Sequence, residues 1–272
     1  MAGAGTERIS ALLALAIPVL AGLAYMAAFG APSHYLLING AVLLAGLALI
    51  AFGGPVVAPL LHWRRLALVA LLALYALPLL TGPELSGIAR WLPLPGGLAL
   101  HAGMLVLPLV AVLAAEDADD APVALLAALL VALLQSDGAS AAAVSLTAVG
   151  LARAWNDWRQ ALVAAIGLLV TVIATLRGEL PPQPFVERVV VDAVLAQPVA
   201  GLLLLAAQLV GFVLIAYALA QPRALRLALG GTLFGFVVLA LINVYPTPLM
   251  GFGAAPILGF ALALAVRRRP GA

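Results

Sequence analysis

Charged and amide side chains are scarce in this chain, and most of those that could do chemistry fall in four short segments between apolar runs. The first segment, residues 82–91, carries Glu84, Arg90 and Trp91. An arginine offers a planar fork of donors that binds a phosphate or carboxylate bidentately. The same residues are as typical of a capped turn whose Trp91 lies in the aromatic belt of a membrane protein.

The second segment is Gln135, Ser136 and Asp137, which separates two apolar runs. An unpaired carboxylate at membrane depth costs on the order of 3 kcal/mol on insertion scales, so Asp137 needs a partner or water. The simpler interpretation is a helix N-cap, in which Asp137 or Ser140 accepts backbone amides at the start of the next helix. Such a cap can still be indispensable to a site without touching a substrate.

The third segment contains three prolines and then Glu187, Arg188 and Asp192. Proline prevents helix and stiffens the chain, after which residues 186–196 are predicted to form a short surface helix. Arg188 and Asp192 are spaced i and i+4 and therefore share one face of it. Two functions remain open for them: a surface ion pair of little energetic value, or a carboxylate that serves as general base for a lipid-linked substrate.

The fourth segment, residues 243–256, is rich in proline, glycine and alanine, which let helices or a ligand approach the backbone closely. Packing alone explains such a stretch in most membrane proteins. The chain has no cysteine, and His34, His62 and His101 fall on different joints without the spacing of metal ligands. We therefore predict no metal site and no cofactor.

The composition determines which elements must position these segments. The chain has 272 residues, of which 65% are hydrophobic and 9% charged, whereas a soluble protein carries about 25% charged residues. In lipid every backbone polar group must be satisfied internally, which leaves helical bundles and closed barrels. Runs of roughly 15–20 Leu- and Ala-rich residues fit membrane-crossing helices. We predict an all-α polytopic transmembrane bundle with about ten spans: 9–29, 35–52, 66–80, 98–115, 122–134, 139–154, 161–176, 199–219, 225–244 and 249–266.

The arginines indicate the orientation, because positively charged short loops stay in the cytoplasm. With both termini inside, ten of the 13 basic residues fall on inner joints, and only Arg90, Arg177 and Arg188 fall outside. The whole chain, residues 1–272, is predicted to be one integral membrane domain. Its two longest outer segments are residues 81–97 and 177–198, and long joints in a compact bundle are more often functional than accidental.

Taken in order, the four segments resemble the SEDS family, the shape, elongation, division and sporulation membrane proteins of bacteria. Residues 82–91 are similar to the family's outer-loop pattern that ends in Gly-Ala-x-Arg-Trp, and residues 135–137 look like its Gln-Pro-Asp step with Ser in place of Pro. Residues 187–192 are similar to its Pro-Glu-Arg-x-x-Asp stretch. Residues 246–255 are similar to its closing Pro-Leu-Pro-Phe-x-Ser-Tyr-Gly-Gly-Ser motif. The resemblance covers the chain from about residue 80 to its end.

This resemblance implies a glycosyltransferase of the bacterial inner membrane that extends peptidoglycan from lipid II, an undecaprenyl-linked saccharide, at the outer face. It also implies a transpeptidase partner, contact with membrane lipid and no nucleic acid. Asp192 would deprotonate the acceptor hydroxyl, while Arg90 and Arg188 would hold the donor diphosphate. The remaining residues expected to bind substrate are Glu84, Asp137 and Glu187.

Several departures from the family pattern keep other functions open. The outer loop is shorter, Asp192 is one residue further from Glu187 than the pattern expects, and the closing motif reads Gly251, Phe252, Gly253, Ala254, Ala255. These changes favour a non-catalytic relative that binds a lipid carrier or scaffolds a partner enzyme. A small-solute transporter is the third hypothesis, and it ranks last because few polar residues besides Gln208 lie within the spans.

Overall fold

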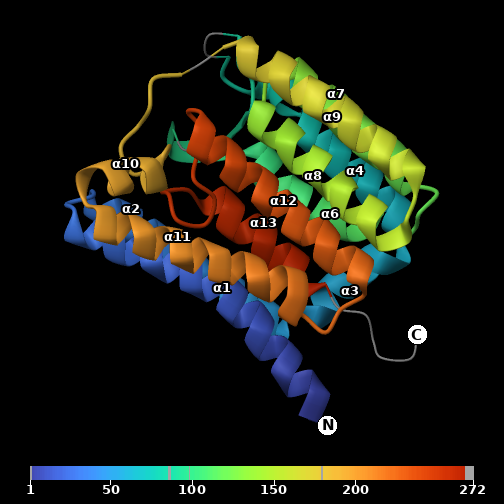
Figure 1. Ribbon diagram of the computed structural model, residues 1–272, viewed down its shortest axis with the longest axis horizontal. Helices are drawn as coiled ribbons and strands as arrows, with labels where there is room; N and C mark the ends of the chain where they lie inside the picture. Colours follow the sequence, from blue (N-terminus) through green and yellow to red (C-terminus); the bar gives the residue numbers. More distant parts are fainter. Residues whose placement is uncertain (1, 85–86, 98, 179, 267–272) are drawn as a thin grey trace.

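The computed structural model of the protein describes residues 2–84, 87–97, 99–178 and 180–266. Within these ranges the regular secondary structure is helical apart from one two-stranded hairpin (Figure 1). The longer helices are α1 (Ala2–Ala28), α2 (Ser33–Phe52), α4 (Arg64–Ala76), α6 (Ala102–Ala114), α7 (Ala121–Leu134), α8 (Gly138–Trp155), α9 (Trp158–Leu176), α11 (Pro198–Val213), α12 (Arg223–Ile242) and α13 (Ala254–Ala265). The shorter elements are α3 (Gly54–His62), α5 (Pro78–Thr81), β1 (Trp91–Pro93), η1 (Pro95–Gly97), β2 (Ala99–His101), α10 (Val189–Ala196) and the π-helical turn η2 (Leu214–Ala218).

Ten helices coincide with the ten predicted spans, so the all-α polytopic membrane fold is confirmed. Six of the spans in the described part of the chain are long and apolar enough to cross a membrane by themselves, namely α1, α2, α4 with α5, α9, α11 with η2, and α12. Three others, α6, α7 and α13, are apolar but shorter. Large apolar side chains face outward along the peripheral helices α2, α4, α9 and α11, as lipid contact requires.

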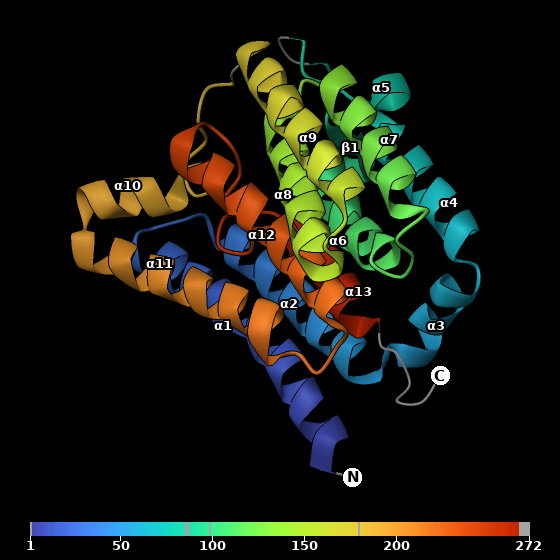
Figure 2. The same ribbon diagram turned by 45° about the vertical axis from the view of Figure 1, so that its right-hand side comes forward.

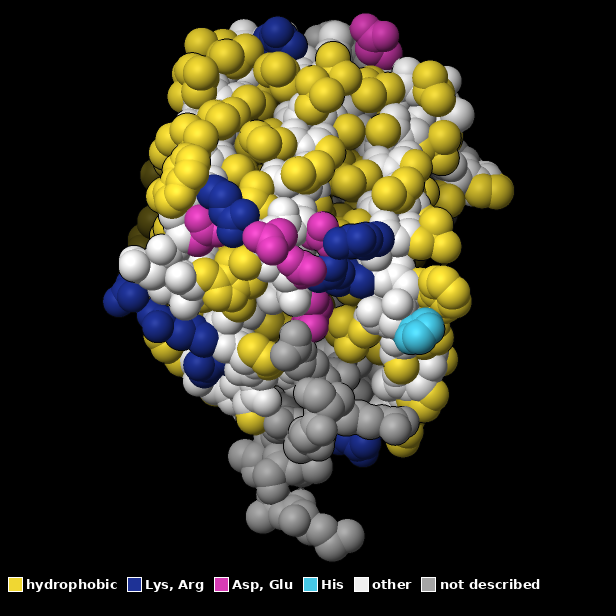
Figure 3. Space-filling view, turned by 90° about the vertical axis from the view of Figure 1, so that its right-hand side faces the viewer, with side chains coloured by type: hydrophobic (Ala, Val, Ile, Leu, Met, Phe, Trp, Pro, Cys, Tyr) yellow, Lys and Arg dark blue, Asp and Glu magenta, His cyan; other side chains and the backbone are white. Residues whose placement is uncertain are grey.

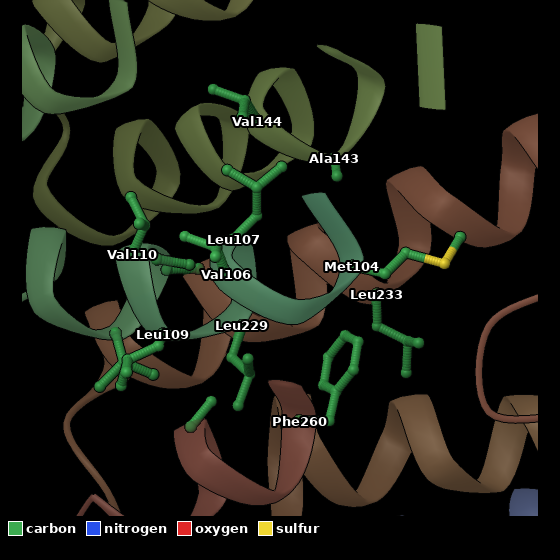
Figure 4. Packing of buried hydrophobic residues seen from close by; sticks show 14 of the residues in the cluster. Met104, Val106, Leu107, Leu109, Val110, Ala143, Val144, Leu229, Leu233 and Phe260 are labelled. Atoms are coloured by element: carbon green, nitrogen blue, oxygen red, sulfur yellow. The ribbon is translucent and has the colours of Figure 1, made fainter. Parts of the chain in front are cut away.

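Helices α8 and α12 form the most extensive contact and lie at the centre of the bundle, with α6 against both of them and α13 packed on α6 (Figures 1 and 2). Apolar side chains of α6, among them Met104 and Leu107, fill the space between α8, α12 and α13 (Figure 4). The hydroxyls of Thr147 and Thr232 are 2.7 Å apart across the α8–α12 contact. Small residues let the two backbones approach this closely.

Gly231 provides a direct test of this close contact. A β-carbon on Gly231 would overlap the backbone carbonyl of Leu146 in α8, whereas one on Gly40 in α2 would meet nothing within 4 Å. We expect Gly231→Ala to destabilise the protein by roughly 1–3 kcal/mol, the usual cost of overpacking. Gly40→Ala should be neutral or stabilising, because alanine is the better helix former. The free energies of unfolding of the two variants, measured in detergent, test this expectation. Equal values for Gly231→Ala and Gly40→Ala would show that Gly231 is not needed for the close helix contact.

The joints predicted to share the inner side gather at one end of the bundle, where charged pairs link them. Arg64 bonds Asp117 at 2.8 Å and also Asp120, and Arg159 bonds Asp119 at 2.9 Å. The hydrogen bond from Arg64 holds the pKa of Asp117 below its usual range. Figure 3 shows arginine and acidic side chains gathered beneath a broad hydrophobic surface. The C-terminal arginines 267–269, which the orientation also rests on, lie outside the described residues.

Several elements differ from the sequence prediction in their bounds. Helix α1 begins at Ala2 rather than at residue 9, and the span predicted for 98–115 begins with strand β2, so helix α6 starts only at Ala102. The joint before Arg64 contains the helix α3, which begins at a Gly-Pro pair. The third span is interrupted after Ala76, where Pro78 starts the short helix α5 because proline cannot continue the preceding hydrogen-bond ladder. Helix α13 begins at Ala254 rather than 249, since Leu249 and Gly253 both have positive φ angles. The predicted surface helix after the prolines is confirmed as α10.

Candidate functional site

Arg90 is almost fully buried, with 2% of its surface exposed, at the predicted outer end of the bundle. It directly precedes β1, which pairs antiparallel with β2 so that Trp91 lies opposite His101. The Arg90 carbonyl accepts a hydrogen bond from Ala102 N at 3.0 Å, which joins the hairpin to the start of α6. The guanidinium carbon lies 4.7 Å from the centre of the Trp91 ring and 4.9 Å from that of Tyr245. Two aromatic faces therefore hold the cation in place.

Asp137 lies in a tight turn between α7 and α8 and is fully buried. Ser136 has a left-handed φ of 54°, and the amides of Ser136 and Asp137 donate to Leu133 O and Ala132 O, which completes the C-cap of α7. The Asp137 carboxylate then caps α8 by accepting from Ser140 N at 3.2 Å and from the Ser140 hydroxyl. The predicted N-cap is thus confirmed, and local backbone geometry fixes one buried carboxylate at the turn between α7 and α8.

The Asp137 carboxylate faces two cationic or donor groups. Arg90 Nη1 lies 3.9 Å from Oδ1, and His101 Nε2 lies 3.5 Å from Oδ2. His101 also caps α6, because its Nδ1 accepts from Met104 N at 3.3 Å. In the neutral ring the proton therefore belongs on Nε2, the nitrogen directed at Asp137. The cluster combines a guanidinium, a carboxylate and an imidazole from three different segments.

Tyr245 connects this cluster to the loop between α12 and α13. Its hydroxyl accepts a hydrogen bond from Gly138 N at 3.0 Å, next to Asp137, and its ring covers Arg90. Gln135 links the same turn to helix α4, because its Nε2 donates to Tyr75 O at 2.6 Å. The Ala89 amide donates to Gln135 O at 3.4 Å, so the Gln-Ser-Asp turn holds the Arg90 segment directly.

Glu187 approaches the cluster from the long joint between α9 and α10. It is 8% exposed, forms an isolated backbone bridge with Pro246, and accepts from Gln183 N at 2.8 Å. Burial raises the pKa of the Glu187 carboxyl, while the Gln183 amide and the positive charge of Arg90 act in the opposite direction. A second carboxylate therefore lies within electrostatic reach of the guanidinium.

The other predicted site residues lie apart from the buried cluster. Asp192 is on α10 with 55% of its side chain exposed, and Arg188 Nε lies 3.8 Å from its Oδ1, as the i and i+4 spacing predicts. Arg188 directly precedes α10, at its N-cap position, with a left-handed φ of 55°. Glu84 is exposed on the segment that leads to Arg90. The structure thus brings Arg90 and Asp137 together and places Glu187 against the loop that carries Tyr245, and among the described residues it gives Asp192 no contact with Arg90 or Asp137.

Sequence reasoning did not identify His101 and Tyr245 as members of the site. No second ligand follows His101 at metal spacing, and packing alone explains the stretch that contains Tyr245. A weak signal for His101 existed, since it stands where a helix cap is expected at the start of α6. No local signal places Tyr245 over Arg90, because that contact spans more than 150 residues and depends on tertiary pairing.

Several hydrogen-bond donors and acceptors of the cluster have no partner among the described residues. Arg90 Nε, His101 Nε2 and Gln135 Oε1 are buried and have no hydrogen-bond partner within the described part of the chain. Buried polar atoms are nearly always satisfied, so these atoms indicate a place where a polar ligand group or water can bind. The described residues contain no group of three His, Asp or Glu side chains that could hold a metal ion. The arrangement suits an oxyanion bound to the guanidinium fork.

No family model and no curated protein sequence matches this chain. Two solved structures do. The rod shape determining protein RodA of Thermus thermophilus matches with a TM-score of 0.68 and 22% identity over 94% of this chain and 93% of that one. A chain from a peptidoglycan synthase complex, described as coordinating polymerization and crosslinking, matches with a TM-score of 0.58 and 22% identity over 93% and 95%. The chain therefore has a SEDS-like fold, and this much of the predicted resemblance is confirmed.

Proposed function

We propose that this protein acts in cell-envelope synthesis in the bacterial inner membrane and binds the diphosphate of an undecaprenyl-linked saccharide at Arg90. The proposal rests on the surroundings of the Arg90 side chain and on its missing hydrogen bond. It is buried between two aromatic rings, its nearest carboxylate oxygen is 3.9 Å away, and its Nε makes no hydrogen bond with described residues. A buried guanidinium normally donates hydrogen bonds from both sides of its planar group.

The chemistry of a diphosphate fits this side chain. An arginine fork donates two parallel hydrogen bonds to neighbouring phosphate oxygens, and such charge-assisted bonds are about twice as strong as neutral ones. The rings of Trp91 and Tyr245 hold the guanidinium plane in one orientation, which reduces the entropy lost on binding. The His101 Nε2 proton, which faces Asp137, supplies a second donor in the same cluster.

In the enzymatic version of this proposal Asp192 is the general base. The exposed carboxylate would take the proton of an acceptor sugar hydroxyl while that oxygen attacks the anomeric carbon of the donor. The bond from this carbon to the diphosphate breaks as the new glycosidic bond forms, and the lipid diphosphate leaves with the electron pair. Arg188, with Glu84 and Glu187, would complete the substrate-binding residues at the outer face, and a membrane-anchored transpeptidase would crosslink the product.

The non-catalytic version keeps the lipid-binding site and omits the transfer. It is favoured by the separation of Asp192 from the Arg90 cluster among the described residues. Such a protein would bind the lipid carrier and serve as a scaffold for a partner enzyme. The two versions share Arg90 and differ only in whether Asp192 has a role.

One comparison of variants separates these versions. Purified protein is incubated with lipid II, and the products are resolved on a gel. If the protein is a polymerase, Asp192→Asn should lower the rate by roughly 100-fold or more, the usual contribution of a general base. Asp119→Asn, an exposed aspartate at the opposite end of the bundle, is the matched control and should be fully active. A wild-type protein that binds undecaprenyl diphosphate without forming polymer would support the scaffold, and absence of both would refute the proposed function.

A further inference from the structure

Asn39 joins helix α2 to the loop between α12 and α13 through both atoms of its amide. Its Nδ2 donates to Gly251 O at 3.0 Å, and its Oδ1 accepts from Gly253 N at 3.1 Å. The side chain is completely buried. Asparagine is suited to this pairing because it presents a donor and an acceptor on one planar group. A polar side chain within an apolar span thus has both of its hydrogen-bonding functions used on one loop.

The loop that Asn39 holds, residues 243–253, pairs in turn with residues 183–189 of the long outer joint. The Thr247 amide donates to Val186 O at 3.0 Å, and the Arg188 amide donates to Tyr245 O at 3.3 Å. The Val189 amide donates to the Thr247 hydroxyl at 3.0 Å. These bonds fix the two segments against one another over a short stretch, and Glu187 lies in the middle of it opposite Pro246.

The same loop supplies the ring that covers Arg90. Tyr245 contacts the guanidinium with its ring and accepts from Gly138 N with its hydroxyl. A continuous series of contacts therefore runs from Asn39 through the loop to Tyr245, whose ring covers Arg90, and to Glu187, which is bridged to Pro246. Helix α2 has no side chain in the buried cluster, yet it is connected to the cluster through this loop.

The loop depends on its neighbours for its conformation. Leu249 is a buried, non-glycine residue with a left-handed φ of 66°, a conformation that persists only where the surroundings impose it. Tyr35, one turn before Asn39, stacks on Phe252 with ring centres 3.7 Å apart and planes at 3°. Gly22 of α1 approaches the Met250 carbonyl so closely that no β-carbon would fit. Among these contacts, Asn39 alone bonds the loop backbone on both sides of Phe252.

We propose that Asn39 is a positioning residue for the Arg90 site, which holds residues 243–253 in the one conformation that keeps the Tyr245 ring over the guanidinium. The inference rests on the proposed diphosphate site for its binding readout. Asn39 itself touches neither Arg90 nor any atom of the polar cluster among the described residues. Its effect passes through the backbone of Gly251 and Gly253.

The test compares Asn39→Leu with Gln208→Leu in the full-length protein. Gln208 is a buried amide in α11 whose side-chain atoms have no hydrogen-bond partner among the described residues, so it is a matched change of size and polarity. Affinity for undecaprenyl diphosphate is measured by calorimetry in detergent. Asn39→Leu should bind roughly 10- to 100-fold more weakly, the range expected when supporting groups misplace a site by about 1 Å. Gln208→Leu should bind like wild type.

A second readout separates failure of this inference from failure of the proposed function. Amide hydrogen exchange should accelerate at residues 186–189 and 245–247 in Asn39→Leu and stay unchanged in the central helices α8 and α12. If wild type does not bind the diphosphate, the proposed function falls, while the exchange pattern still decides the role of Asn39. Folded Asn39→Leu with wild-type exchange in these segments and wild-type affinity would overturn the inference. If Asn39→Leu does not fold, two other variants replace it and are measured in the same way. Asn39→Asp keeps the acceptor for Gly253 N, and Tyr35→Leu removes the ring stacked on Phe252.

Discussion

Arg90→Lys is expected to weaken binding of undecaprenyl diphosphate by roughly 10- to 100-fold, because one lost charge-assisted hydrogen bond costs about 1.5–3 kcal/mol. Lysine keeps the positive charge that compensates Asp137, so the protein should remain folded. It cannot present the planar pair of donors, and it stacks poorly between the rings of Trp91 and Tyr245. The substitution therefore separates recognition of the diphosphate from the stability of the buried pair.

Two controls make this result specific. Arg159→Lys changes a partly exposed arginine at the opposite end of the bundle, where it forms a 2.9 Å pair with Asp119, and it should leave the affinity unchanged. Undecaprenol, which has the same chain without phosphate, should bind wild type and Arg90→Lys equally. Equal affinity of wild type and Arg90→Lys for the diphosphate would show that Arg90 is a structural arginine and that the ligand, if any, binds elsewhere.

The sequence predicted the helices well because each depends on local composition. Apolar runs of sufficient length, interrupted by Pro, Gly or charge, specify membrane helices independently of their neighbours. The cap at Asp137 was predictable for the same reason, since an N-cap and the serine three residues later lie within one turn. The surface helix α10 with its Arg188–Asp192 pair was likewise a matter of local spacing.

What the sequence could not predict was the set of contacts that assemble the site. Tyr245 reaches Arg90 because two loops far apart in the chain pair through their backbones, and backbone pairing leaves no pattern of side-chain types. His101 reaches Asp137 because β1 and β2 place it opposite Trp91, and three-residue strands are too short to show a period. Helix α3 was missed because its two prolines read as a loop. Local composition therefore predicts the helices, whereas the site depends on contacts between segments that are far apart in the chain.

The largest loss of stability is expected for Asp137→Ala, at roughly 3–5 kcal/mol, the usual cost of removing one partner of a buried ion pair. Asp137 has no exposed surface and Arg90 has 2%, so the guanidinium would be left buried with its nearest carboxylate gone. The variant also loses the cap of α8, which adds about 1 kcal/mol. Asp137→Asn should lose less, because asparagine is a good N-cap and retains an oxygen for Ser140 N.

The matched control is Asp157→Ala, since Asp157 caps α9 in the same way at the opposite end of the bundle. It accepts from Arg159 N at 2.9 Å, but its ion pair with Arg159 is open to solvent and therefore contributes little. We expect it to lose much less stability than Asp137→Ala, because only a helix cap is removed. Reversible unfolding of the four proteins in mixed micelles would give the differences directly. If Asp137→Ala were no more destabilised than Asp157→Ala, the charge of Asp137 would not be what compensates Arg90, and Glu187 would become the carboxylate on which the buried guanidinium depends.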